Sequence, residues 1–417
     1  MGAKIEIMYK ELRLHECSYN SGIKVRIYPS SKQKEIIKLN SDMSRFFYNQ
    51  YVALGLEKKK VNDLIKNGSS GSQLESLEER LEEIKFLNKN PNNLSKQFDW
   101  INTKKNIDPQ TKYLALRNYK DAWNMWRKVP KSKPPTFKKK NSIHKYSTDS
   151  CKIMNENQIY VNKIGVLRIS GLDLSKIHDE LYVGKTTIIK DADDKYYLSA
   201  TIASKKPFSK GFNKTKSRVG IDLNLSNFLV DSNDVTINNP KYEKKMRKKL
   251  AKEQRSLARK REAAKKENRK LSESKNYQKQ RKLVASLYKK ITNQRKDFNH
   301  KVSTRIVKTY DFIVAEDIRP SNMVKNHKLA RAIADVSWAG FLTMLEYKSL
   351  REGKTFIKVD PRYTTQTCSC CGHIMSGATK IRLGVKKWDC PKCNAHHNRD
   401  HNAAKNILQK GLELTEK

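Results

Sequence analysis

The chain has 417 residues, enough for two to four separately folded units. Its 87 basic and 43 acidic residues leave a formal net charge of +44, while apolar residues make up 37% and the mean hydropathy is −0.80. No apolar run approaches the roughly 18–20 residues that cross a bilayer, which excludes a membrane-spanning protein.

Self-repulsion at this charge opposes compaction unless a polyanion is bound. Nucleic acid is the expected polyanion, and an anionic membrane surface is the rival. We expect no signal peptide. Five of the seven cysteines lie between Cys368 and Cys393. Such clustering favours metal binding over a disulfide framework, so we expect an intracellular protein. Cys17 and Cys151 stand alone and are interpreted as structural thiols.

The first 130 residues predict one strand followed by helices. Lys24 to Tyr28 alternates as a short strand with a basic face. Ser30 and Gln33 have capping-box spacing, and the apolar residues that follow predict a helix from about 31 to 60. Further amphipathic helices are expected over residues 74–87 and 114–126.

The sequence pattern changes at Pro130 from helical periodicity to a basic loop, which is followed by short strand-like runs. Together these runs predict a small β-domain, and the strand near residue 25 is expected to complete it. The helices would then be an insertion in that domain. The predicted strands are 159–161, 166–169, 186–189 and 196–202.

The second half predicts a further sheet. A strand over residues 219–225 places Ile221, Leu223 and Leu225 on one face, so Asp222 points the other way. Residues 228–230 would pair back as a hairpin, and an apolar strand over 312–315 ends at Glu316. The remaining predicted elements are a strongly basic helical stretch over 241–300 with a bend around 272–274, a helix over 333–351 and a strand over 355–359.

The basic stretch has two interpretations. A run of charge is often simply a solvated face. As a whole, however, this density of positive charge favours a surface that follows phosphates.

Two C-x2-C pairs, Cys368 with Cys371 and Cys390 with Cys393, have the spacing of a zinc ribbon. Four thiolates would hold structural Zn2+ in a hairpin with too little apolar surface to fold alone. Cys370 is interpreted as a bystander. The nearby histidines are expected not to be ligands: His396, His397 and His401.

A second group of candidate site residues consists of three acids: Asp222, Glu316 and Asp400. Asp400 begins a predicted final helix, in which Ala403, Ala404 and Ile407 face inward. Carboxylate oxygens suit Mg2+ or Mn2+, and two such ions roughly 4 Å apart would activate water against a phosphodiester. Taken singly, each acid is more often a surface acid or a cap, so spacing alone leaves both interpretations open.

These residues resemble the TnpB family of transposon-encoded RNA-guided DNA endonucleases, which is related to miniature type V CRISPR effectors. The resemblance depends on an ordered set of motifs along nearly the whole chain. They are Lys24 to Pro29, Arg45 to Asn49, Pro135 to Lys138, Val219 to Leu223, Asn239 to Tyr242, Glu316 to Ile318, Asp335 to Trp338, Thr364 to Cys368, the paired knuckles and Arg399 to Ala404. Asn224 stands where many relatives have glycine, and residues 60–110 match no pattern that we can align.

The resemblance implies an α/β multidomain fold. It would combine an RNase H-like RuvC nuclease domain with an inserted zinc ribbon and a wedge β-barrel with an inserted helical recognition domain. The implied boundaries are the wedge at 1–30 and 131–210, the recognition domain at 31–130, RuvC at 217–365 and 396–417, and the zinc ribbon at 366–395.

The resemblance also implies site residues and partners. Asp222, Glu316 and Asp400 would be the catalytic Mg2+ ligands, and Cys368, Cys371, Cys390 and Cys393 the Zn2+ ligands. A guide RNA and target double-stranded DNA would be the partners, with no membrane and no small-molecule substrate. The expected localisation is the cytoplasm, associated with the nucleoid of a prokaryote.

The expected function is therefore RNA-guided, Mg2+-dependent cleavage of DNA next to a short adjacent motif. Two alternatives remain: a guided binder that represses without cutting, and an unguided zinc-ribbon accessory protein of a transposon. The second alternative explains the charge and the cysteines but not the ordered acids.

Overall fold

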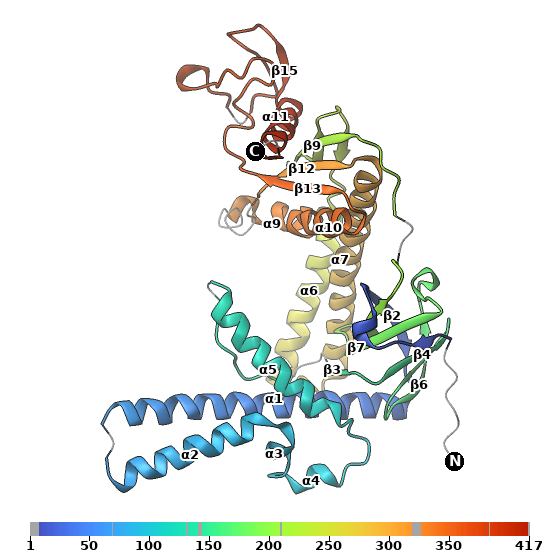
Figure 1. Cartoon of the computed structure of the whole chain (residues 1–417), viewed down its shortest axis with the longest axis vertical. Coiled ribbons are helices and arrows are strands. Elements are labelled where there is room, and N and C mark those ends of the chain that lie inside the picture. Colours follow the sequence, from blue (N-terminus) through green and yellow to red (C-terminus); the bar gives the residue numbers. More distant parts are fainter. Residues whose placement is uncertain are drawn as a thin grey trace. The chain divides into compact units, whose positions relative to one another are not determined.

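The computed structural model describes residues 8–68, 70–130, 132–140, 144–208, 211–318, 327–382 and 384–415. The chain divides into two units, residues 1–210 and 211–417, each described by itself below (Figure 1). Within the described residues, no helix is long and apolar enough to cross a membrane.

An eight-stranded sheet, counted over the described residues, organises the first unit. Its order is β1-β7-β8-β2-β6-β5-β4, and β3 pairs with β7 off this path. The strand predicted near residue 25 does complete this sheet, because β2 pairs with both β6 and β8. The bounds are β1 Lys10–Glu11, β2 Tyr19–Tyr28, β3 His144–Thr148, β4 Cys151–Asn155, β5 Gln158–Val161, β6 Gly165–Ser170, β7 Glu180–Lys190 and β8 Tyr196–Ser204.

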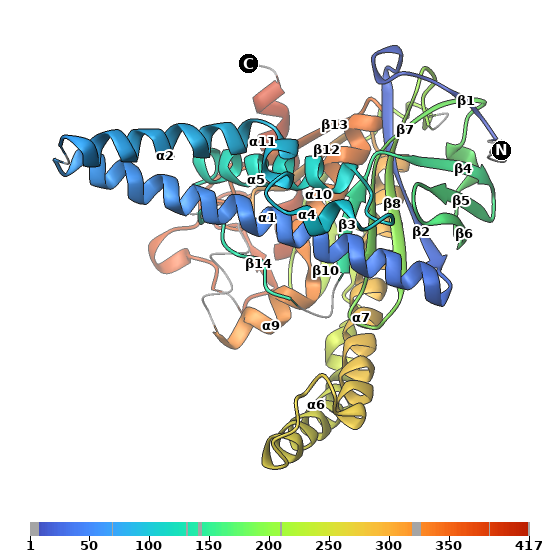
Figure 2. The ribbon, with the colours of Figure 1, turned by 90° about the horizontal axis from the view of Figure 1, so that it is seen from below.

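The helices lie between β2 and β3 in the chain, as the insertion hypothesis requires. The predicted capping box is present: Gln33 N donates to Ser30 Oγ at 3.3 Å and Ser30 N donates to Gln33 Oε1 at 2.9 Å. Helices α1 and α2 run side by side (Figure 2). The bounds are α1 Ser31–Lys66, α2 Ser72–Lys89, α3 Pro91–Ser95, α4 Asp99–Asn102 and α5 Gln110–Lys128.

The second unit contains a mixed five-stranded sheet within the described residues, in the order β11-β10-β9-β12-β13. β9, β12 and β13 are mutually parallel, while β10 and β11 run antiparallel to their neighbours. The predicted hairpin after the first strand is thereby confirmed. The bounds are β9 Arg218–Asp222, β10 Asn227–Asp231, β11 Thr236–Asn238, β12 Phe312–Glu316 and β13 Thr355–Val359.

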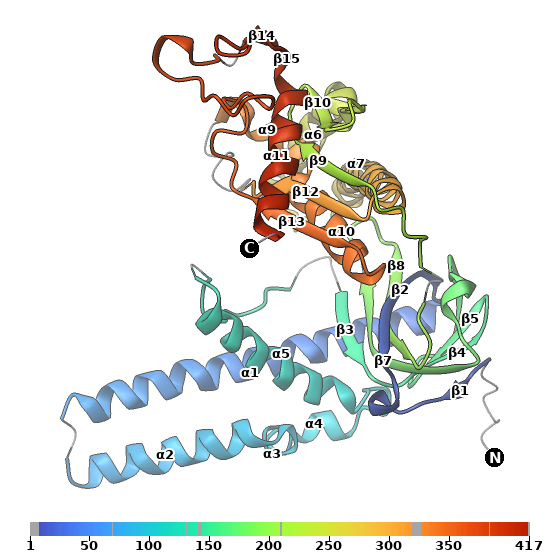
Figure 3. The ribbon, with the colours of Figure 1, turned by 45° about the horizontal axis from the view of Figure 1, so that its top comes forward.

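Helices cover both faces of this sheet. α7 (Lys275–Thr309) and α10 (Trp338–Arg351) pack with Ile221 and Ile313 in one core. α11 (Arg399–Thr415) lies across the opposite face, where Ile407 meets Val314 (Figure 3). The alternation of Ile313 and Val314 between two cores follows from the period-2 geometry of a strand. The unit is thus α/β, as expected.

Three predictions for this unit need correction. The first strand ends at Asp222 and does not continue to Leu225, because the chain turns there into β10. The predicted helix over 333–351 is two helices, α9 (His327–Val336) and α10, because Ser337 adopts a left-handed φ of 57°. The bend in the basic stretch is a full break between α6 (Tyr242–Lys266) and α7.

α6 and α7 form a hairpin of two adjacent helices around a small core that contains Leu250, Leu287 and Ile291. Asp335 anchors its base: its carboxylate accepts from Glu243 N at 3.1 Å and from Arg295 Nε at 2.8 Å. The basic face is therefore held to the rest of this unit by a buried acid.

The segment before α11 is a small hairpin, in which β14 (Lys387–Asp389) pairs antiparallel with β15 (His396–Asn398). β15 continues directly into α11, and the Asn398 side chain caps that helix by accepting from Asp400 N at 3.1 Å.

Candidate metal-dependent nuclease site

Asp222 and Glu316 are neighbours at one edge of the second sheet. β9 and β12 are parallel, and Ile221 pairs with Ala315, so the next residues on each strand, Asp222 and Glu316, stand side by side. Both are the last residues of their strands. In α/β sheets the carboxyl ends of parallel strands are where ligands usually bind.

Both acids point toward α11. A Cβ on Gly220 would lie 2.1 Å from Ala404 O, so this face of β9 touches the helix backbone. Asp222, two residues further on, points to the same face. Val314 likewise contacts α11 at Gly411, which gives Glu316 the same orientation.

Asp400 completes the group from the first turn of α11. Its carboxylate accepts from Asn224 Nδ2 at 3.3 Å and from Lys386 Nζ at 3.1 Å. Asn224 Oδ1 also accepts from Asn227 N at 2.8 Å, which fixes the turn after β9. The residue that departs from the family pattern, Asn224, therefore contacts the acid directly.

Electrostatics shows that the three acids are close. Burial raises the pKa of Asp222 from 3.8 to about 7, and repulsion from Glu316 and Asp400 adds to that rise. Burial also raises the pKa of Glu316, although Thr364 Oγ1 donates to Glu316 Oε1 at 2.7 Å and opposes the shift. Attraction to Arg399 lowers the pKa of Asp222 and attraction to Lys410 lowers that of Glu316, but burial outweighs both, so neither carboxyl group is favoured as an anion.

The arrangement is open and does not by itself form a tight cage. Within the part of the chain that the structure describes, the acids are not among the groups whose ligand atoms all lie within 4.8 Å of one another. The ammonium group of Lys386 forms an ion pair with one carboxylate oxygen of Asp400, so a positive charge lies beside this acid.

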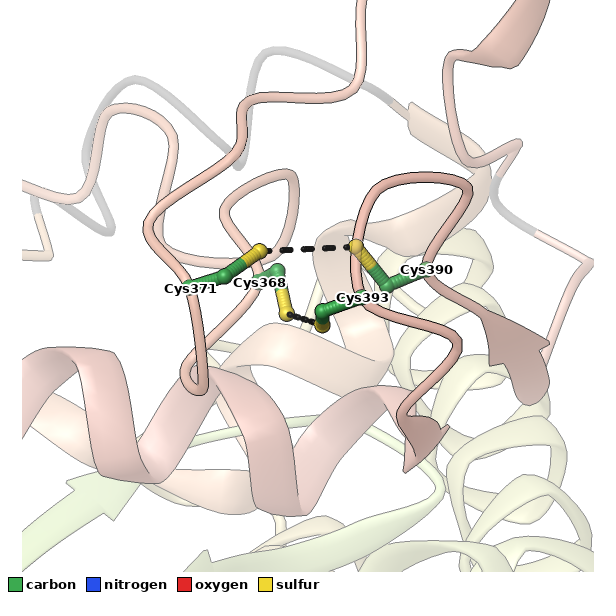
Figure 4. A group of neighbouring side chains, drawn as sticks. All are labelled: Cys368, Cys371, Cys390 and Cys393. Carbon is green, nitrogen blue, oxygen red and sulfur yellow. Dashed lines mark hydrogen bonds between the residues drawn. The ribbon is translucent and has the colours of Figure 1, made fainter.

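The predicted zinc ligands do converge. The Sγ atoms of Cys368, Cys371, Cys390 and Cys393 all lie within 4.8 Å of one another, and they point toward a common centre (Figure 4). Cys371 and Cys390 are 3.6 Å apart, and Cys368 and Cys393 are 3.7 Å apart. Sulfurs bound tetrahedrally at the usual Zn–S length of about 2.3 Å would be about 3.8 Å apart. The donor set therefore fits Zn2+.

One histidine lies closer to this cluster than expected. His397 Nε2 is 3.1 Å from Cys368 Sγ, and Cys368, Cys370 and His397 form a second possible ligand group. His397 also packs against Trp388, with ring centroids 4.5 Å apart. His396 instead contacts Asp389, and His401 contacts Ser232 O at 3.1 Å, so neither lies in a cysteine group.

Sequence reasoning missed the side chains that join α11 to the segment entering the ribbon. Asn402 Oδ1 accepts from Ser369 N at 2.9 Å, and Asn406 Nδ2 donates to Thr364 O at 2.8 Å. Both asparagines are buried. A signal was present, because two asparagines four residues apart among inward-facing alanines need hydrogen-bond partners.

Comparison with protein families gives three matches along the chain. A model described as a helix-turn-helix domain matches residues 19–58, one described as "Probable transposase" matches 205–327, and both are named for OrfB of IS605. A Cas12f1-like TNB domain matches residues 338–407. In this structure residues 19–58 form β2 and most of α1 and contain no helix-turn-helix.

Several curated proteins are similar to this chain. A Streptomyces pristinaespiralis protein, named provisionally as an RNA-guided DNA endonuclease, is 39% identical over 199 residues, covering 48% of this chain and 46% of the relative. An Escherichia coli K12 protein with the same provisional name is 28% identical over 93% of this chain and 91% of its own length. A TnpB-like protein of Acanthamoeba polyphaga mimivirus is 29% identical over 56% of this chain and 44% of its own. The chain thus aligns with under half of the first and third relatives and nearly all of the second.

Among solved structures, a Cas12f1–sgRNA–target DNA complex aligns over 94% of this chain and 99% of its own, at 16% identity and a TM-score of 0.31. Likeness at that level carries no argument. The ordered family matches and the named relatives do carry one: along its length the chain is similar to OrfB proteins of IS605 and to proteins named as RNA-guided DNA endonucleases or TnpB-like.

Proposed function

We propose that this chain is an RNA-guided DNA endonuclease that cuts double-stranded DNA next to a short motif by Mg2+-dependent phosphodiester hydrolysis. The observation that carries the proposal is the meeting of Asp222, Glu316 and Asp400, from β9, β12 and α11, at one edge of the second sheet. The names of the relatives support guided DNA cleavage as the chemistry.

The domain assignment is part of the same proposal. The sheet of the second unit, with α11 on one face, is the RuvC nuclease domain of RNase H-like fold over 217–365 and 396–417. Residues 366–395 form its zinc ribbon. In the first unit the sheet is the wedge domain over 1–30 and 131–210, and residues 31–130 are the recognition domain.

In the mechanism, Asp222, Glu316 and Asp400 would hold Mg2+ or Mn2+. When bound, such ions supply an activated water and neutralise charge on the phosphate and the leaving oxygen. Asn224 orients Asp400, and Thr364 orients Glu316, through the hydrogen bonds described above. Burial of Asp222 excludes competing water from one side of the site.

The cysteines Cys368, Cys371, Cys390 and Cys393 hold structural Zn2+. Because β15 continues into α11, an ordered ribbon fixes the position from which Asp400 projects. When bound by the four cysteines, Zn2+ would keep the ribbon ordered and thereby support the position of Asp400, with no role in the reaction itself.

The net charge of +44 supports an RNA partner in addition to DNA. In guided nucleases, base pairing reads the target while the protein reads duplex shape and the adjacent motif. We expect the same division here.

The test uses the protein purified with its co-isolated RNA, a DNA duplex that matches the sequenced RNA, and Mg2+. Wild type should cut. Asp222→Ala should slow cutting at least about 1,000-fold, or about 4 kcal/mol of transition-state stabilisation, while binding to the duplex is retained. Asp297→Ala, an exposed acid on α7, serves as the control and should cut like wild type.

The alternatives predict different results. A guided repressor would bind the matched duplex and never cut it with any divalent ion. An accessory DNA-binding protein would yield no discrete co-purifying RNA. Either outcome overturns the proposed activity.

A further inference from the structure

His397 lies against the candidate zinc site without being one of its four cysteines. Its Nε2 atom is 3.1 Å from Cys368 Sγ, and its side chain is buried. Among the residues that the structure describes, His397 does not join the group in which the ligand atoms of the four cysteines all lie within 4.8 Å of one another. A zinc ion held by four thiolates therefore leaves this short contact unexplained.

The hairpin of β14 and β15 holds the imidazole ring in this position. His397 is buried while its neighbours on β15, His396 and Asn398, are exposed, as the alternation of a strand requires. Trp388 is the residue paired with His397 across the hairpin, and their ring centroids lie 4.5 Å apart with 35° between the planes. Packing against this cross-strand partner keeps the His397 nitrogen directed at the sulfur.

Metal binding decides which atom of the contact carries the hydrogen. A cysteine binds a metal ion as the thiolate, which has no hydrogen and can only accept. The contact is then favourable only if His397 Nε2 carries a hydrogen and donates it to Cys368 Sγ. A divalent ion with four thiolates leaves an excess of negative charge, and a hydrogen bond to a charged group stabilises its charged form.

The same contact joins two parts of the ribbon that are distant in the sequence. Cys368 belongs to the first cysteine pair, whereas His397 follows the second pair, 29 residues further along the chain. β15 continues into α11, and Asn398 caps that helix by accepting from Asp400 N. The contact thus links the first cysteine pair to the strand that precedes Asp400, by a route that does not pass through the metal.

We propose that His397 is a positioning residue of the zinc site. Its Nε2–H donates to the metal-bound Cys368 thiolate, strengthens Zn2+ binding and holds the first cysteine pair to β15. The inference rests on the part of the proposed function that gives the four cysteines a structural Zn2+. Hydrogen-bond partners of metal ligands are commonly worth about 10- to 100-fold in metal affinity.

The test measures Zn2+ affinity of the full chain by competition with a chelator of known affinity. His397→Phe keeps an aromatic ring against Trp388 but removes the N–H, and it should bind Zn2+ about 10- to 100-fold more weakly than wild type. His397→Gln places an amide N–H near the position of Nε2 and should bind Zn2+ more tightly than His397→Phe. The control His396→Phe makes the same change at the exposed neighbour and should match wild type.

A spectroscopic measurement separates this hydrogen bond from general support of the fold. In the Co2+-substituted protein, loss of the N–H donor leaves the Cys368 sulfur more electron-rich. The sulfur-to-cobalt charge-transfer band of His397→Phe should therefore move to longer wavelength, and His397→Gln should move it back toward the wild-type position. Wild type and both variants should keep four sulfur ligands on the ion.

Two affinity results would overturn the proposal: wild-type Zn2+ affinity in His397→Phe, or an affinity of His397→Gln no better than that of His397→Phe. A second ion per chain in wild type that His397→Phe loses would also overturn it, because His397 would then be a ligand together with Cys368 and Cys370. A wild-type chain that holds no Zn2+ contradicts the zinc assignment in the proposed function as well. Guided cutting measured on the same preparations tests the nuclease assignment separately.

Discussion

Replacing Asp222 by asparagine should stabilise the protein when no divalent ion is bound. The pKa of Asp222 is raised from 3.8 to about 7, so the folded state disfavours its ionised form. A shift of about three units corresponds to about 4 kcal/mol of destabilisation when the group is charged.

The sign follows from proton binding. Between pH 3.8 and about 7 the folded state retains a proton that the unfolded chain has lost, so stability falls as pH rises through this window and is level above it. Asparagine has no such proton. The stability gain of Asp222→Asn should therefore be roughly 2 kcal/mol at pH 5 and about 4 kcal/mol at pH 8.

Urea unfolding of wild type, Asp222→Asn and the exposed control Asp297→Asn would measure this gap. Divalent ions are removed by passage over a chelating resin, so that Zn2+ in the ribbon is retained. Adding Mg2+ at pH 8 should then stabilise wild type more than Asp222→Asn, because binding to the folded state adds stability by mass action. A gap that is absent, reversed or independent of pH would refute the electrostatic reasoning.

Three other predictions concern the ribbon and the sheet. Lys386→Ala should lower the Mg2+ concentration that gives half-maximal cutting by up to about fivefold, since the half-exposed ion pair of Lys386 with Asp400 is worth at most about 1 kcal/mol. The control Lys387→Ala should leave that concentration unchanged. A higher Mg2+ requirement in Lys386→Ala would contradict the expectation. Metal analysis should find no stoichiometric Zn2+ in Cys390→Ser, whereas Cys370→Ser should keep one Zn2+ ion per chain. Loss of Zn2+ from Cys370→Ser would show that the Cys370 thiol is a ligand. Gly220→Ala should destabilise by about 3 kcal/mol in denaturant unfolding, because the new methyl meets a helix carbonyl; a neutral variant would show that α11 does not pack on β9.

The elements that carry the three acids could be predicted because that signal is local, whereas the role of the acids was implied only by the resemblance. β12 reads as an apolar run closed by Glu316, and Asp400 precedes inward-facing Ala403 and Ile407 at helical spacing. The four zinc thiols were predictable for a similar reason, since two short spacings encode the site. That three acids should be neighbours was a hypothesis, and only strand register and packing could place them together.

What could not be predicted depends on contacts between distant segments. Lys386 meets Asp400 through the fold of the ribbon, and Asn224 meets it through the turn after β9. Ser337 interrupts a helix without any local breaker: it has a left-handed φ between Val336 and Trp338, which are both buried in the core of this unit. β3 was missed because His144 and Lys145 obscure the alternation.

The close contact between Gly220 and α11 also determines where the chain tolerates a change in length. The backbone of α11 at Ala404 packs directly against the backbone of β9 at Gly220. The turns of α11 after Ala404 therefore cannot rotate to accommodate an added residue. One residue inserted between Asp400 and that contact would turn Asp400 by about 100° around the helix axis and aim it away from β9. In the loop between the two cysteine pairs, a Cβ added at Gly372, Gly377 or Gly384 would meet nothing within 4 Å. Natural variation in length should therefore collect inside the ribbon and be absent from the junction that follows it.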